Sequence, residues 1–196
     1  MLKHPLPAVL AAAALALPAL SRAALPEFIQ PPAQSLRQQV LLDAGETSYG
    51  AIGALYEASL SPANSVEAGV NFTGNGLPSD YFSASGVKAG FHWWIPQDFW
   101  PHPQARLLGW FAGPEIQADF VSWHYQYTGS GRDSYGTFFG GGAEGGYQWI
   151  FHPGLTARLY AEADYLAGNL DGLPGAPGVG YGGLAVGGHA AVGWSF

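Results

Sequence analysis

The segment Leu155-Thr-Ala-Arg-Leu-Tyr-Ala-Glu-Ala-Asp-Tyr165 alternates between two classes of residue without a break. Its odd positions hold leucine, alanine or tyrosine, and its even positions hold threonine, tyrosine and three charged residues. Successive side chains of a β-strand point to opposite faces, so this segment has one apolar face and one charged face. We predict a strand whose two faces meet different surroundings.

The same two-residue period recurs along most of the chain, and the charges nearly always fall on the face opposite the apolar residues. One such segment could be a half-buried strand of a soluble sandwich, but five or six are harder to explain that way. Counting back from the C-terminus gives seven strand segments. If the strands close into a ring with both chain ends on the same side, their number must be even, so we predict an additional first strand. We predict strands at 38–44, 50–60, 64–73, 84–95, 105–122, 134–151, 154–167 and 184–196.

Composition excludes several classes of protein. Only 11% of the 196 residues are charged, against about 25% in ordinary soluble domains. The 29 glycines and the 14% of aromatic residues argue against a helical bundle, because glycine destabilises helices. Beyond the first two dozen residues there is no apolar run of about 18 residues, which excludes transmembrane helices. The absence of cysteine excludes disulfides, thiolate metal sites and cysteine nucleophiles.

Residues 1–23 are predicted to be a signal peptide. Lys3 precedes an apolar run at 8–20, and Ser21-Arg22-Ala23 matches a cleavage site. Its removal near Ala23 takes away Lys3 and Arg22, so the mature chain is more acidic than the formal −7 of the whole sequence. Nucleic acid is therefore not an expected partner. Residues 24–37 are interpreted as a periplasmic lead-in, and 38–196 as a barrel.

The connections between strands come in two lengths. Residues 61–64 and 152–154 are predicted tight turns, whereas 74–83, 124–133 and 169–182 are predicted long loops. Short periplasmic turns and longer outer loops are typical of outer-membrane barrels. We predict an all-β fold, an eight-stranded antiparallel up-and-down transmembrane β-barrel in the bacterial outer membrane. The connection at 96–104 is long for its predicted periplasmic side.

Aromatic residues gather near the predicted strand ends, as in the two girdles of membrane barrels. Trp194 and Phe196 in the last strand also resemble the signal read by the barrel-assembly machinery, an expected partner. The predicted periplasmic girdle comprises Trp93, Trp94, Phe99, Trp100, Trp149, Phe151, Trp194 and Phe196, and the outer one Phe72, Tyr81, Phe82, Phe120, Trp123, Tyr125 and Tyr135.

The stretches ALYEASLSPANSVEAGV (54–70), GGAEGGYQWIF (141–151) and AVGWSF (191–196) resemble a family of small, largely uncharacterised bacterial outer-membrane barrels. That family is a domain of unknown function with an architecture of the OmpA/OmpX type. The resemblance implies fold and location and no catalytic residues. The family has an arginine after its Tyr-Glu pair, where this chain has Ala58, so Glu57 must be balanced by another group.

The alternation places a set of charged residues inside the barrel. We interpret them as a packed polar plug around Lys88 and Arg158, because buried charges must be paired or neutralised. The acids outnumber the bases, so the alternative is a cation site or a narrow cation-selective channel. The predicted interior network is Glu57, Glu67, Lys88, Glu115, Asp119, Glu144, Arg158, Glu162 and Asp164, with His92 on the same side.

The expected role is structural or one of surface interaction, with no catalysis, cofactor or metal. Outer-membrane lipid and lipopolysaccharide are the expected surroundings, and the outer loops could bind a surface partner. One alternative is a lipid A-modifying hydrolase using Ser122 and His124, which share a face, with Asp119 of opposite parity as the acid. Another is a soluble lipocalin-like barrel with reversed faces, disfavoured by the scarcity of charge.

Overall fold

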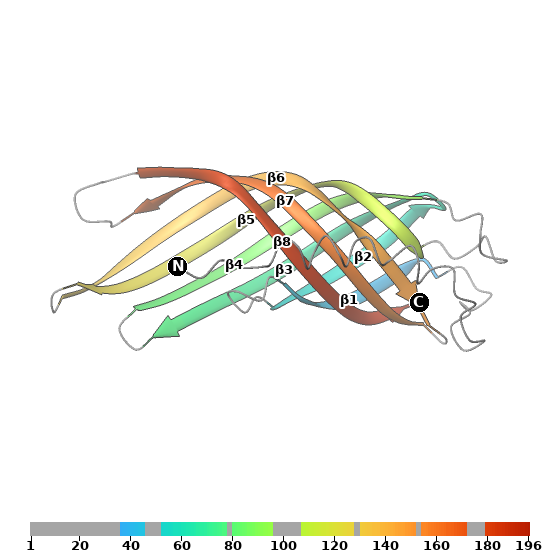
Figure 1. Cartoon of the computed structure of the whole chain (residues 1–196), viewed down its shortest axis with the longest axis horizontal. Coiled ribbons are helices and arrows are strands. Elements are labelled where there is room, and N and C mark those ends of the chain that lie inside the picture. The colour runs from blue at the N-terminus through green and yellow to red at the C-terminus, as the bar shows by residue number, and fades with distance from the viewer. Residues whose placement is uncertain are drawn as a thin grey trace, which may run out of the picture. The chain divides into compact units, whose positions relative to one another are not determined.

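The computed structural model describes residues 36–45, 52–77, 80–95, 107–127, 130–151, 154–171 and 179–196. The predicted signal peptide and most of the predicted lead-in lie outside these residues. Eight strands follow one another along the chain (Figure 1). They are β1 (Gln38–Ala44), β2 (Ile52–Ser61), β3 (Asn64–Leu77), β4 (Asp80–Trp94), β5 (Gly109–Tyr127), β6 (Ser130–Ile150), β7 (Leu155–Asp171) and β8 (Val179–Ser195).

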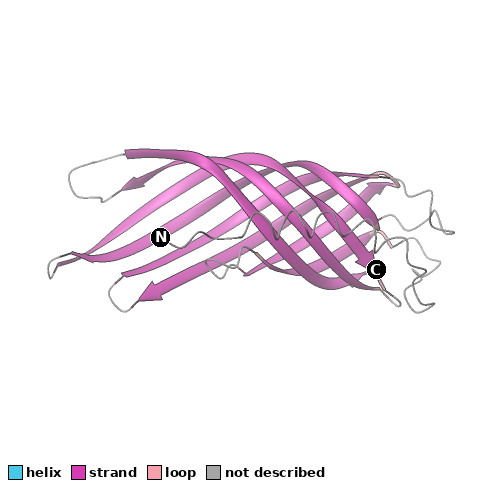
Figure 2. Ribbon diagram, viewed as in Figure 1, coloured by secondary structure: helices cyan, strands magenta, loops and turns pink. Residues whose placement is uncertain are grey.

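The strands form one closed antiparallel ring. Each strand pairs with its neighbours in chain order, and β1 pairs with β8. Figure 2 shows strands and connections and no helix among the described residues. No described helix is long and apolar enough to cross a membrane. The predicted eight-stranded up-and-down barrel is thus confirmed as the fold.

The first strand closes the ring, as predicted from the need for an even number. Exposed and buried residues alternate along β1 from end to end. The carbonyl oxygen of Phe196 accepts hydrogen bonds from the backbone nitrogens of Arg37 and Gln38, both at 3.0 Å. The nitrogen of Phe196 donates to the Gln38 carbonyl at 2.8 Å.

Two predicted long loops are mostly strand, which corrects the sequence-based boundaries. β3 and β4 stay paired to Leu77 and Asp80, and β5 and β6 to Tyr127 and Ser130. The remaining loop tips, 78–79, 128–129 and 172–178, lie outside the described residues. Backbone pairing needs no apolar alternation, so these polar and glycine-rich ends extend the ladders without a pattern that reveals them.

The tight turn between β6 and β7 depends on one glycine. Gly154 has a φ of 140° and donates its backbone N–H to the carbonyl of Phe151 at 2.7 Å. A side chain at this position would be strained by that φ, and its Cβ would also lie 2.5 Å from the carbonyl oxygen of Ser195. Glycine therefore fixes this turn.

The two faces of the wall differ sharply. Large apolar side chains face outward, among them Leu184 at 73% exposed and Ile116 at 67%. Arg158, Glu57 and most other charged side chains face inward and are buried. This distribution is the opposite of a lipocalin-like barrel, so that alternative is wrong.

One residue of the predicted periplasmic girdle faces the interior instead, and Trp123 of the predicted outer girdle, 40% exposed, has the inward parity of Glu115. Trp94 is 5% exposed, and its Nε1 donates to the Ser65 hydroxyl at 2.7 Å. It has the same parity as His92, and strand parity outweighs the general preference of tryptophan for girdle positions. Phe99 and Trp100 lie outside the described residues, as do the side chains of Tyr81, Phe82 and Tyr125.

Acids alternate with glycines around the interior. Cross-strand partners run from Glu67 on β3 to Gly90, Glu115, Gly142 and Asp164 on β7. An eight-stranded barrel has an interior only wide enough to be filled by side chains, so each large residue needs a small neighbour. This accounts for glycine in the middle of strands, where it otherwise weakens the ladder.

Replacing a tightly enclosed glycine should destabilise the barrel. A Cβ at Gly146 would lie 2.2 Å from the Leu159 carbonyl oxygen and 2.5 Å from the Tyr160 Cβ, whereas a Cβ at Gly183 has nothing within 4 Å. We expect Gly146→Ala to lose at least about 1–3 kcal/mol of stability through overpacking and Gly183→Ala to fold normally. The measurement is the folded fraction after refolding in detergent, read as heat-dependent gel migration; equal fractions would contradict the steric argument.

Candidate functional site: the buried charge network

Arg158 is the centre of the interior. It lies on β7 with no exposed surface, and its guanidinium binds both Glu57 and Glu67. Its Nε also donates to Gln148 Oε1 at 2.8 Å, and its Cζ lies 4.7 Å from the centre of the Phe111 ring. A planar guanidinium suits this position because it can donate to several carboxylates at once.

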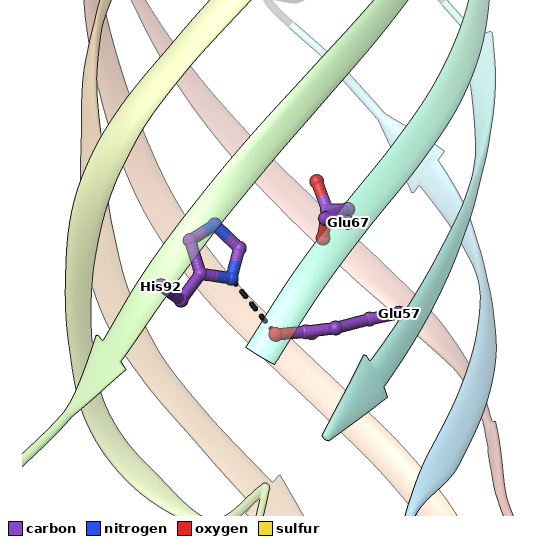
Figure 3. Close-up of side chains that lie close together, drawn as sticks. All are labelled: Glu57, Glu67 and His92. Carbon is purple, nitrogen blue, oxygen red and sulfur yellow. Dashed lines mark hydrogen bonds and ion pairs between the residues drawn. The ribbon is translucent and has the colours of Figure 1, made fainter. Parts of the chain in front are cut away.

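His92, on β4, connects a carboxylate of β2 to one of β6. Its Nδ1 lies 2.8 Å from Glu57 Oε1, and its Nε2 lies 2.6 Å from Glu144 Oε1. Figure 3 shows His92 pointing across the interior toward Glu57, with Glu67 beside them. Two carboxylates on one ring match the two N–H donors of an imidazolium.

Glu57, Glu67 and His92 also have a spacing that could hold a metal ion, with one ligand atom from each within 4.8 Å of the others. Arg158 already binds both carboxylates, and each nitrogen of His92 faces a carboxylate. The positive charge at this group is thus supplied by the protein itself.

Lys88 is shared among four carboxylates. Its Nζ lies 3.3 Å from Glu144, 3.4 Å from Glu115, 3.6 Å from Glu162 and 3.7 Å from Glu67. One ammonium carries a single positive charge against four carboxylates, so it neutralises the group only in part.

Lys88 also adjoins a second acidic group. One oxygen each from Glu115, Glu162 and Asp164 lies within 4.8 Å of the others. Oε1 of Glu115 and Oδ1 of Asp164 are buried and have no hydrogen-bond partner. Acids therefore exceed bases here, as the sequence indicated for the interior as a whole.

The structure places every member of the predicted interior network on the inner face. Glu57, Glu67, Lys88, Glu144 and Arg158 meet around one centre. Glu115, Glu162 and Asp164 form the neighbouring group. Asp119 also points inward, since its Oδ1 would lie 2.1 Å from a Cβ at Gly86.

Polar residues outside the predicted network complete it. Gln39 Nε2 donates to Glu57 Oε2 at 2.5 Å, and Gln148 Nε2 donates to Gln39 Oε1 at 2.9 Å. His189 Nδ1 lies 3.0 Å from Asp43 Oδ2. Strand parity would have identified Gln39 and Asp43, because they occupy the two ends of the inward face of β1.

The position after Glu57 is Ala58, where the resembled family has arginine. In this chain the opposing charge comes from Arg158 on β7. A residue far along the sequence thus balances Glu57, and its identity as the partner could not be read from local spacing.

The three candidate catalytic residues do not come together. His124 Nδ1 lies 2.5 Å from Asp133 Oδ1, its cross-strand partner on β6. Ser122 has the parity of His124, whereas Asp119 points inward. Asp133, not Asp119, is the acid beside His124.

The two residues of the predicted assembly signal lie at the end of the last strand, and their side chains face outward. Trp194 is 46% exposed and Phe196 is 56% exposed. Both side chains are accessible from outside the barrel.

Comparison with known proteins supports the fold. The solved N-terminal β-barrel domain of OprF from Pseudomonas aeruginosa is similar, with a TM-score of 0.51 and 14% sequence identity over 83% of this chain and 98% of that domain. Neither a protein-family model nor a curated protein matches this sequence. The likeness supports the predicted OmpA-type architecture, and at this identity it concerns the fold alone.

Removing the central guanidinium should strongly destabilise the barrel. Arg158→Gln leaves Glu57 and Glu67 buried without their main partner, a change that costs about 3–5 kcal/mol in comparable buried pairs. Urea unfolding of the refolded protein measures the loss. The double variant Arg158→Gln/Glu57→Gln should be less destabilised than Arg158→Gln alone; a double variant with the full sum of both losses would contradict direct pairing.

Proposed function

We propose that this protein is an integral β-barrel of the bacterial outer membrane, exported by the predicted signal peptide, with a structural or surface-interaction role. The observation that carries this proposal is the inverted distribution of side chains. Among the charged side chains described on the strands, only Asp133 faces outward, and the outward face is rich in exposed leucine, valine, isoleucine and aromatic residues. Soluble monomers rarely expose apolar patches beyond a few hundred Å².

Strand length supports a role at the cell surface. A membrane strand needs about 9–11 residues, whereas β4 has 15 and β6 has 21. The excess lies in the hairpins β3–β4 and β5–β6, which extend on the same side of the ring. On this proposal these hairpins project beyond the lipid and present the surface for a partner.

The interior argues against free conduction. Arg158, Glu57 and His92 are all fully buried and bound to one another or to shared partners across the lumen. Eight-stranded barrels are narrow enough for side chains to fill. The narrow cation-selective channel is thus the less favoured alternative.

A charge on the outward face should distinguish a membrane protein from a soluble one. Ile116→Lys places an ammonium on the lipid-facing side and should cost up to about 2–4 kcal/mol near the bilayer centre, reducing the heat-shifted band in the outer-membrane fraction. Ser83→Lys is the matched control, because Ser83 lies on the outward face close to the β3–β4 hairpin, and this variant should insert normally. Equal insertion of both variants, or a soluble periplasmic wild type, would refute the proposal.

The pair His124–Asp133 favours one further candidate, a hydrolase acting on lipid esters. The pair sits on the outward face of β5 and β6, with Ser122 on the same face. A groove of about 560 Å³ lies beside it, lined by Phe120, Val121, Tyr135, Gly136, Thr137, Phe139, Gly168 and Asn169. Its aromatic side chains suit an acyl chain of a membrane lipid.

The chemistry would follow the serine–histidine–acid scheme. Ser122 Oγ attacks the ester carbonyl while His124 takes its proton, and Asp133 holds the ring. The proton then passes to the departing alkoxide, which leaves as an alcohol. Water, deprotonated by His124, releases the acyl group as a carboxylic acid and restores Ser122.

Lipid mass spectrometry tests this candidate. Cells producing the wild-type chain should show outer-leaflet lipid lacking an ester-linked acyl chain, and Ser122→Ala should abolish that change. Ser83→Ala, which removes the cross-strand neighbour hydroxyl, is the control and should retain it. Unchanged lipid in wild-type cells removes the hydrolase and leaves the barrel proposal intact.

A further inference from the structure

The barrel interior holds more negative charge than its own cations neutralise. Its described basic groups are Lys88, Arg158 and two histidines. Facing them are eight carboxylates, from Asp43, Glu57, Glu67, Glu115, Asp119, Glu144, Glu162 and Asp164. Even with both histidines protonated the acids remain in excess, and unpaired buried charge is costly.

The excess is concentrated at Glu115, Glu162 and Asp164. Arg158 and His92 serve Glu57, Glu67 and Glu144, so this second group shares only Lys88 and His189. Lys88 approaches Oε2 of Glu115 and Oε2 of Glu162. Asp164 is 1% exposed and makes no ion pair with any described basic residue.

Two oxygen atoms of this group are buried and lack a hydrogen-bond partner. They are Oε1 of Glu115, whose side chain has no exposed surface, and Oδ1 of Asp164. Native proteins rarely leave such atoms without a partner unless a water or an ion serves them. Lys88 faces the other oxygen of Glu115, so its Oε1 remains available to a second cation.

The backbone provides the space. Gly142 lies between Glu115 and Asp164 in the cross-strand row, and a Cβ there would lie 2.2 Å from Asp164 Oδ1. A larger residue would separate or displace these carboxylates. The Glu162 side chain keeps 18% of its surface exposed, which gives the group a connection to solvent.

We propose that Glu115, Glu162 and Asp164 bind a divalent cation of the calcium type inside the barrel. Hard cations prefer carboxylate oxygens, and opposite ligands of Ca²⁺ are about 4.6–5.2 Å apart, twice its bond length. The three oxygens, all within 4.8 Å of one another, fit within that span. Mg²⁺ demands near-ideal octahedral geometry and gives up its water ligands reluctantly, whereas Ca²⁺ accepts irregular sets of carboxylate oxygens, so Ca²⁺ is favoured.

Calorimetric titration of the full refolded chain in detergent with CaCl₂ tests the site. We expect one Ca²⁺ per barrel, with affinity at least tenfold weaker in Glu115→Gln and in Asp164→Asn. Asp133→Asn removes the same charge from the outward face of β6 and should change the affinity less than threefold. No stoichiometric binding, or equal affinities in all four proteins, would overturn the proposal.

Unfolding in urea separates binding from a merely structural role. Ca²⁺ should raise the midpoint of the wild type and leave that of Glu115→Gln unchanged, because a ligand stabilises only the protein that binds it. In chelator, Glu115→Gln should be as stable as the wild type or more so, since it removes one of several repelling charges. A lower midpoint in chelator, with an undiminished response to Ca²⁺, would make Glu115 a structural residue and refute the site. The outcome does not depend on the outer-membrane or lipid-hydrolase proposals.

Discussion

The rest of the structure depends on the need to compensate charge that is enclosed in the barrel. Each of the eight strands contributes a titratable or charged side chain to the interior, from Asp43 on β1 to His189 on β8. Arg158 links its own strand to β2 and β3 across the lumen. Most partners therefore come from strands that are not neighbours. The charges are stable only inside a closed ring, and the closed ring is held together by their pairing.

Much of the fold could be predicted from the sequence, because strand parity is a local property. The alternation around Glu162 and Asp164 predicted the inward face. The requirement for an even number of strands predicted β1. The extended hairpins were missed because backbone pairing leaves no side-chain signature. Trp94 was misplaced because its nearness to a strand end was weighed above its parity.

The candidate site was predictable only in part, for a physical reason. Parity tells which side chains enter the interior, but the choice of partner depends on the stagger of the strands around the ring. Following cross-strand partners from Gln39 through β2 and on around the ring leads to Ala185 on β8. On the other side Gln39 pairs directly with Ser195 of the same strand, ten residues further along. This stagger brings Arg158 to Glu57, and no local motif records it. The departure at Ala58 indicated that a partner was needed without identifying it.

The pairing of Gln39 with Ser195 has a consequence for how the barrel forms. These residues belong to the first and last strands, so their contact has one of the largest sequence separations in the chain, and such topologies fold slowly. Until β8 is in place, β1 presents an open edge with unpaired backbone groups, a recognised route to aggregation. The order of events during biogenesis is thus constrained: the chain must be kept apart from its copies until its last strand is available, and closure is the step that ends its exposure.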